Sequence, residues 1–149
     1  MTQNAALSPD ERAVHAAVVD TLLPGDGDWP SAGSLDIAGE AARIAALSVA
    51  GLDPLRWLLA ALPAGFATAS ADDREAALRS ASAGEPAGFG SALQSSYNAY
   101  YTHPDVLGVV KAKTGYRGGS PQPDGYELPP FDEAMIATAR TREPLWRKA

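Results

Sequence analysis

Helix-start signals recur along the first 113 residues of the chain and divide them into short segments. In the first signal, Ser8 can cap a helix, Pro9 suits its first position and Glu11 can complete a capping box. Apolar residues then repeat at three- and four-residue spacing until the Pro-Gly pair at residues 24–25 ends the segment. No segment shows the sustained alternation of β-branched residues that is typical of a strand. The pattern therefore predicts an all-α fold.

Further helices follow, each with its own start signal and apolar period. We expect them over residues 34–50, 53–62, 70–82 and 85–101, with a short helix over residues 105–111. In the second helix, Leu47 or Ser48 is expected on the inner face. The chain contains thirty alanines, which favour helix and close packing of helices. Residues 1–113 are therefore predicted to form a compact bundle of about five helices.

The character of the chain changes after residue 113. Between residues 114 and 131, eight of the eighteen residues are Gly or Pro, which is incompatible with regular secondary structure. Aromatic residues interrupt this segment, whereas disordered linkers contain few of them. We therefore expect residues 114–149 to form a long irregular Pro/Gly-rich C-terminal tail, with a short helix at about residues 132–142. This tail would lie either on its own body or on another protein.

Charge and composition exclude several kinds of function. The net charge is −6, which argues against nucleic acid as a main partner, because phosphate binding needs a basic face. Residues 1–110 contain five Lys or Arg and thirteen Asp or Glu, a balance of −8, whereas residues 111–149 contain seven and five, a balance of +2. The basic tail is either an ordinary solvated segment or a binding segment. The chain has no cysteine, which excludes thiolate catalysis, Cys-ligated metals and covalent c-type haem.

Targeting signals are not evident in the sequence. No stretch approaches 18 uninterrupted apolar residues, so we expect no membrane span. Residues 1–7 show neither a basic region, nor a twin arginine, nor an apolar core. We therefore expect a cytoplasmic protein, unless it is exported with a partner that carries a signal.

The Gly-Asp-Gly-Asp stretch at residues 25–28 resembles two ligand-binding loops. It begins like a dinucleotide fingerprint, but Pro30 replaces the last glycine and the stretch follows a helix instead of a strand. It also begins like a calcium loop, but the twelfth position, which should be Glu, is Ile37. We therefore expect a turn with local Asx hydrogen bonds.

The two histidines offer little catalytic chemistry. His15 is expected on a partly buried face of the first helix, and His103 at the end of the fifth helix, where a cation complements the helix dipole. Neither belongs to a nucleophile-elbow or zinc-protease motif. We expect no catalytic, cofactor-binding or metal-binding residue in this chain. The candidate partner-binding residues are mostly aromatic, as interface residues often are: they are Tyr100, Tyr101, His103, Tyr116, Arg117, Tyr126, Phe131 and Trp146.

Three features in a fixed order resemble the gluconate 2-dehydrogenase subunit 3 family. The first is the opening helix running into Thr-Leu-Leu-Pro-Gly-Asp at residues 21–26. The second is Tyr-Tyr-Thr-His-Pro at residues 100–104, and the third is Thr-Gly-Tyr at residues 114–116, followed by the Pro/Gly-rich tail. These features span most of the chain. Members of this family are small helical subunits that accompany flavin-dependent dehydrogenases of the glucose–methanol–choline type.

The resemblance implies a non-catalytic subunit that binds and stabilises a large flavoprotein in a hetero-oligomer. FAD would belong to the large subunit, which oxidises an alcohol or sugar hydroxyl and sometimes passes electrons to a cytochrome subunit. Many relatives carry a twin-arginine signal, which this sequence lacks. Two alternatives stay open: a stand-alone helical domain that binds a small apolar ligand between Ala-rich helices, and an independent enzyme in which His103 is a general base.

Overall fold

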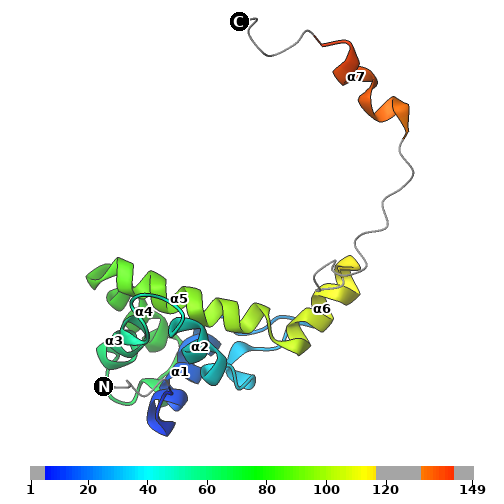
Figure 1. The fold of residues 1–149 in the computed structure, drawn as a ribbon. Coiled ribbons are helices and arrows are strands. Elements are labelled where there is room, and N and C mark those ends of the chain that lie inside the picture. The colour runs from blue at the N-terminus through cyan, green and yellow to red at the C-terminus, as the bar shows by residue number, and fades with distance from the viewer. Residues whose placement is uncertain (1–5, 117–131, 143–149) are drawn as a thin grey trace, which may run out of the picture. The chain divides into compact units, whose positions relative to one another are not determined.

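The computed structural model describes residues 6–116 and 132–142, and these residues form an all-α structure without strands (Figure 1). This confirms the fold class predicted from the helix-start signals. Contacts divide the chain into two units, Met1–Gly118 and Gly119–Ala149. The first unit contains six α-helices among its described residues: α1 (Pro9–Leu22), α2 (Ala38–Ala45), α3 (Asp53–Ala61), α4 (Ala71–Gly84), α5 (Pro86–Tyr101) and α6 (Pro104–Thr114).

Two of the helix starts are fixed by serine caps, as the sequence indicated. The Ser8 hydroxyl accepts a hydrogen bond from Glu11 N at 3.2 Å, and Glu11 Oε2 accepts one from Ser8 N at 2.7 Å. This reciprocal pair is a complete capping box, and it satisfies two backbone donors that the helix itself leaves free. At α4 the Ser70 hydroxyl accepts from Asp73 N at 3.2 Å. Each of these starts depends on residues within one helical turn.

The second helix is shorter than the predicted range of residues 34–50. A 3₁₀ turn over Ala32–Ser34, closed by the Ser31 hydroxyl, precedes it, and extended backbone at Leu35 separates this turn from α2. After Ala45 the chain leaves the helix, and the side chain of Leu47 is 75% exposed. The expectation that the helix extends to residue 50 is therefore wrong, and so is an inward-facing Leu47. The apolar residues of this segment repeat at helical spacing for one turn more than the part of the segment that packs against the body.

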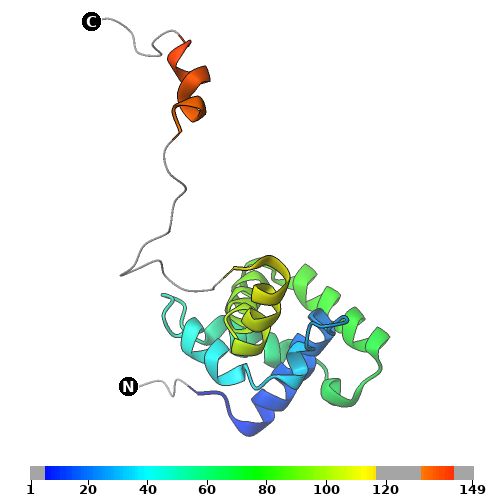
Figure 2. The same ribbon diagram turned by 90° about the vertical axis from the view of Figure 1, so that its right-hand side faces the viewer.

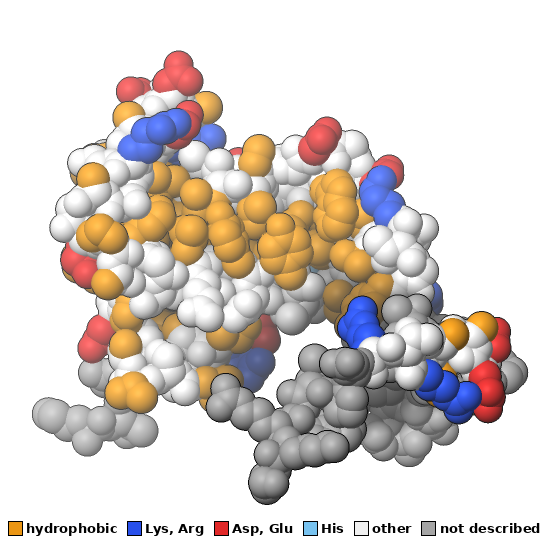
Figure 3. All heavy atoms as spheres, turned by 90° about the horizontal axis from the view of Figure 1, so that it is seen from above, with side chains coloured by type: hydrophobic (Ala, Val, Ile, Leu, Met, Phe, Trp, Pro, Cys, Tyr) orange, Lys and Arg blue, Asp and Glu red, His pale blue; other side chains and the backbone are white. Residues whose placement is uncertain are grey.

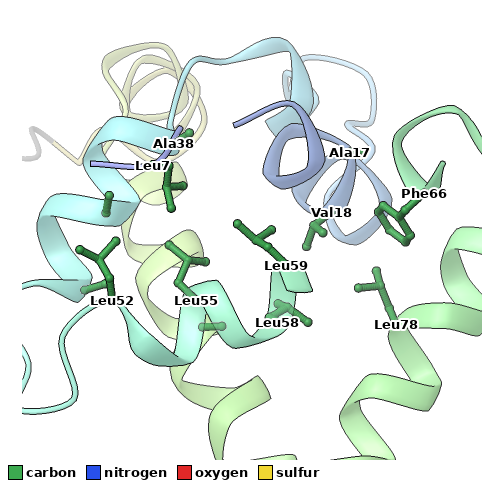
Figure 4. Close-up of a cluster of buried hydrophobic side chains, with 13 residues drawn as sticks. Leu7, Ala17, Val18, Ala38, Leu52, Leu55, Leu58, Leu59, Phe66 and Leu78 are labelled. Carbon is green, nitrogen blue, oxygen red and sulfur yellow. The ribbon is translucent and has the colours of Figure 1, made fainter. Parts of the chain in front are cut away.

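The larger of two buried clusters joins the helices α1 to α5 (Figure 4). Leu55, Leu58 and Leu59 of α3 point into it, as the apolar stripe of this helix predicted. Phe66 enters from a 3₁₀ turn over Phe66–Thr68 and lies near Leu78 of α4 in the figure. Burial of these side chains is the main favourable contribution to the stability of the body.

Small residues line the contact between α2 and α5. The buried face of α2 consists of Ala38, Ala41, Ala42 and Ala45, and that of α5 includes Ala92, Ser95, Ser96 and Ala99. Small side chains let two helices approach closely, so their backbones contribute to the packing themselves. This is the thin, alanine-based core that the composition predicted.

The second buried cluster lies where α1 and α5 end and α6 begins. Its buried members are Val19, Ala32, Ile37, Ala41, Ala99, Tyr100 and Val106. Trp29 and Leu23 pack against it from the segment that follows α1. Figure 2 views the body from the end at which α6 lies. This cluster supports the surface that is described below as the candidate site.

The described part of the second unit is a short helical segment. A 3₁₀ turn over Glu133–Ile136 leads into α7 (Ala137–Arg140), and Asp132 caps the turn by accepting from Ala134 N at 2.9 Å. The predicted short helix over residues 132–142 therefore exists, although its first turn is 3₁₀. Within residues 6–116 and 132–142, no helix combines the length and the apolar character that a membrane span requires.

Candidate partner-binding site

The ends of α1 and α5 form the two walls of an apolar pocket of about 290 Å³. One wall comes from the chain just after α1, and the other comes from the last turn of α5. The residues that line this pocket are Leu22, Leu23, Pro24, Gly25, Asp26, Trp29, Tyr100 and Tyr101. We call it the Trp29–Tyr101 pocket. It brings together two of the three segments that carry the resemblance to the subunit 3 family.

The first wall is a tight turn that glycine makes possible. Asp26 N donates to Trp29 O at 3.2 Å, and Trp29 N donates to Asp26 O at 3.0 Å. Gly25 has φ +83°, and a Cβ at this position would lie 2.7 Å from Ser31 N. A side chain there would therefore meet both backbone strain and a direct clash. The expected turn exists, but backbone hydrogen bonds close it, with no Asx bond at Asp26 or Asp28 among the hydrogen bonds of the described residues.

The second wall is formed by two adjacent tyrosines with different surroundings. Tyr100 is 3% exposed, and its hydroxyl donates to Pro30 O at 2.9 Å across 70 residues of sequence. Burial raises the pKa of the Tyr100 hydroxyl, with a smaller contribution from Tyr101. Tyr101 is 50% exposed, and the two rings lie edge to face with centroids 5.1 Å apart. Tyr100 thus ties the two walls together, and Tyr101 presents its ring to solvent.

His103 caps the start of α6 instead of the end of α5. Its Nδ1 accepts from Asp105 N at 3.3 Å, and its backbone N donates to Tyr100 O at 3.0 Å. The expectation of a cation that donates to the carbonyls of the fifth helix is therefore wrong. The reason is Pro104, which keeps the preceding residue extended and starts a new helix at once. The extended backbone lets the His103 ring fold back over the first turn of α6.

An ion pair joins α6 to the turn of the first wall. Lys113 Nζ lies 2.8 Å from Asp28 Oδ2, although 85 residues separate the two in sequence. This hydrogen bond and the charge of Lys113 lower the pKa of Asp28. Both side chains are exposed, so the pair adds little stability. It nevertheless marks where the end of α6 approaches the turn.

Apolar side chains continue from the pocket along α5. Phe89, Leu93 and Tyr97 are half-buried, and their four-residue spacing leads to Tyr101. Figure 3 views the body from the side on which α5 runs in Figure 1, and hydrophobic side chains form a band across this face. Partly exposed apolar surface of this kind is typical of a protein-binding face.

The second histidine lies away from the pocket and inside the body. His15 is 1% exposed, and its Nε2 lies 3.0 Å from Ser96 Oγ of α5. The Ser96 hydroxyl donates to Ala92 O, so it accepts from His15 Nε2. Nδ1 is buried and has no hydrogen-bond partner among the described residues. Burial lowers the pKa of His15 to about 4, so this ring is neutral at pH 7.

The structure brings together only part of the predicted site. Tyr100 and Tyr101 line the pocket, His103 lies at the next helix start, and Tyr116 is exposed just beyond α6. The sequence did not identify Leu22, Leu23 and Trp29 as site residues. The glycines on either side of Asp26 were the available signal, since they indicate a tight turn that places Trp29 close to the end of α1. Four predicted residues lie outside the described residues: Arg117, Tyr126, Phe131 and Trp146.

No group of three or more His, Asp or Glu side chains in the described parts of the chain is arranged to hold a metal ion. Comparisons of this chain with models of known protein families, with curated proteins and with solved structures gave no match. The resemblance to the subunit 3 family therefore stays a prediction from the sequence.

Proposed function

We propose that this chain is a non-catalytic subunit that binds and stabilises the large subunit of an FAD-dependent alcohol or sugar dehydrogenase or oxidase. One observation supports this most: residues 22–26 and 100–101, from two of the segments that carry the resemblance, line the Trp29–Tyr101 pocket together. Segments that are distant in sequence and meet at an apolar surface fit a shared binding role. FAD and the reacting groups would belong to the large subunit.

The chemistry of the pocket supports binding of a protein surface. Tyr101 and Trp29 are aromatic, and aromatic side chains contribute much of the binding energy at protein interfaces. The band of apolar side chains on the α5 face offers area for a wider contact next to the pocket (Figure 3). A hetero-oligomer would cover both features.

A small apolar ligand is the rival occupant of this pocket. Sites for small molecules are usually concave clefts of about 300–1,000 Å³ that bury most of the ligand. The Trp29–Tyr101 pocket, at about 290 Å³, lies just below this range and opens to solvent. A side chain presented by a partner protein fits it better, because the remainder of the partner can cover the opening.

Co-expression with a glucose–methanol–choline-type flavoprotein from the same genome tests the proposal. We expect the two chains to purify together, and the flavoprotein to be less soluble or less loaded with FAD when it is produced alone. The measurements are co-elution on size-exclusion chromatography, the flavin absorbance per protein and the rate of alcohol oxidation. The control is the flavoprotein co-expressed with the Val49→Ala variant, because Val49 is fully exposed and does not line the pocket.

Two results would contradict the proposal. The first is that the two chains purify separately. The second is that the flavoprotein produced alone equals the co-expressed sample in solubility, flavin content and rate of alcohol oxidation. The cytoplasmic location also stays a prediction, and cell fractionation with an antibody to this chain would test it.

A further inference from the structure

Four features of the fold shape the Trp29–Tyr101 pocket. The Asp26–Trp29 backbone pair fixes the turn, and Gly25 permits its close approach to Ser31. The Tyr100 hydroxyl bonds Pro30 O across the pocket wall, while Lys113 holds Asp28 from α6. A pocket that is already formed loses little conformational entropy when it binds, so a short segment is enough to occupy it.

One carboxylate, that of Asp26, lies at the exposed rim of this otherwise apolar pocket. Asp26 lines the pocket and is exposed, and no Lys or Arg in the described parts of the chain forms an ion pair with it. The neighbouring Asp28 differs, because Lys113 already neutralises it. The uncompensated charge at the rim is therefore negative. An occupant with a positive charge next to an apolar group would complement both features.

We propose that the Trp29–Tyr101 pocket receives one aromatic or large aliphatic side chain of a partner protein, with a Lys or Arg beside it in the partner's sequence. The apolar side chain packs between the Trp29 and Tyr101 rings, and the cation pairs with Asp26. The identity of the partner as a flavoprotein rests on the proposed function, whereas the chemistry of the occupant rests on the pocket alone.

Short peptides test this chemistry on the full chain. The probe is a Gly/Ser peptide with a central Lys-Trp-Arg, and it is titrated into the ¹⁵N-labelled protein while amide and indole shifts are followed by NMR. We expect saturable shifts of the Trp29 indole and of the amides at residues 22–26, with a Kd of about 1 mM, which is typical of a single anchor. A Glu-Trp-Glu peptide should bind at least fivefold more weakly at low salt, and high salt should reduce this difference. A Lys-Ala-Arg peptide should produce no saturable shift.

Matched variants separate the two parts of the site. Asp26→Asn should bring the Lys-Trp-Arg and Glu-Trp-Glu peptides to within twofold of each other, whereas Asp72→Asn, an exposed aspartate on α4, should preserve the preference. Tyr101→Ala should weaken binding of the Lys-Trp-Arg peptide at least threefold, and Val49→Ala should leave it unchanged. The inference is wrong if the shifts do not saturate, if they occur elsewhere, or if the charge of the peptide has no effect.

Two further outcomes separate this inference from the proposed function. If the peptides bind as expected but the flavoprotein does not co-purify, the pocket chemistry stands and the partner is another protein. If the peptides fail to bind and the flavoprotein binds the Asp26→Lys and Tyr101→Ala variants as tightly as the parent chain, it uses another surface, and the inference is overturned while the proposed function stands. Binding that is seen only after deletion of residues 143–149 would identify the chain's own C-terminus as the occupant, which also overturns the inference.

Discussion

At the scale of single residues, His15 links the stability of the body to pH. Burial lowers its pKa from 6.5 to about 4 in the folded state, whereas the unfolded chain keeps the ordinary value. Between these two values only the unfolded state binds the proton, so acid favours unfolding. Above pH 6.5 the neutral His15 ring causes no loss of folding stability. As the pH drops from 6.5 toward 4, the free energy of unfolding falls by about 3 kcal/mol in total.

Replacement of His15 by Gln isolates this effect, because Gln can still donate to Ser96 but does not titrate. Urea unfolding at pH 7, 5.5 and 4 should show that the His15→Gln variant loses about 3 kcal/mol less stability across the range than the parent chain. The carboxylates that titrate near pH 4 are common to both proteins and cancel in the comparison. If the free energy of unfolding falls equally in both proteins as the pH is lowered, protonation of His15 does not contribute to unfolding in acid.

Gly25 and Gly27 provide a second comparison at this scale, because both have positive φ but only one is crowded. A Cβ on Gly25 would lie 2.7 Å from Ser31 N and 2.8 Å from Trp29 O, whereas a Cβ on Gly27 would meet nothing within 4 Å. We expect Gly25→Ala to lower the free energy of unfolding by about 3 kcal/mol and Gly27→Ala by about 1 kcal/mol. Thermal and urea denaturation would measure both. Equal effects would show that the turn moves freely to accept a side chain.

At the scale of elements, helix ends that depend on bonds within one turn could be predicted from the sequence, whereas helix ends that depend on packing could not. Ser8 with Glu11 and Ser70 with Asp73 start helices through bonds within one turn, so the sequence alone identifies them. The start of α2 has no side-chain cap, since Ile37 occupies that place, and its position depends on burial of Ile37 in the second cluster. His103 was misplaced for a different reason: its bond from Asp105 N is local, and the signal for it was Pro104 at the first position of the next helix.

Leu47, compared with Leu58 of α3 as a buried reference, tests whether the segment after α2 contributes to the core. Leu58 is 1% exposed within the larger cluster, whereas Leu47 is 75% exposed beyond the end of α2. Leu58→Ala should lower the free energy of unfolding by about 3 kcal/mol, because it removes buried apolar surface and leaves a cavity. Leu47→Ala should change it by no more than about 0.5 kcal/mol. Urea denaturation measures both, and a large effect at Leu47 would restore the longer helix that its apolar period predicted.

At the scale of the whole molecule, the candidate site depends on contacts that no local pattern contains. Tyr100 and Tyr101 face different surroundings because adjacent helical residues point in different directions, which local helix geometry explains. The sequence did not indicate that Tyr100 would bond Pro30, or that Lys113 would reach Asp28, because each pair is separated by 70 residues or more. Such contacts follow from how α1, α5 and α6 pack. The sequence could thus indicate which segments matter, but it could not predict that they lie next to each other in the fold.

The division into Met1–Gly118 and Gly119–Ala149 leads to a test of what each part contributes. All buried residues of both clusters lie between Leu7 and Val106. A chain that ends at Gly118 should therefore keep its helical circular dichroism and unfold at the same urea concentration as the body of the full chain. Peptide binding should also remain, because the Trp29–Tyr101 pocket lies within residues 22–101.

The same truncated chain should bind the flavoprotein more weakly in a pull-down, because the sequence analysis names Tyr126, Phe131 and Trp146 as candidate partner-binding residues. The full chain is the positive control, and the Tyr101→Ala variant of the full chain shows how much the pocket contributes without truncation. A loss of helicity on truncation would make the C-terminal residues part of the core. Full retention of the flavoprotein would instead assign the whole interface to the helical body.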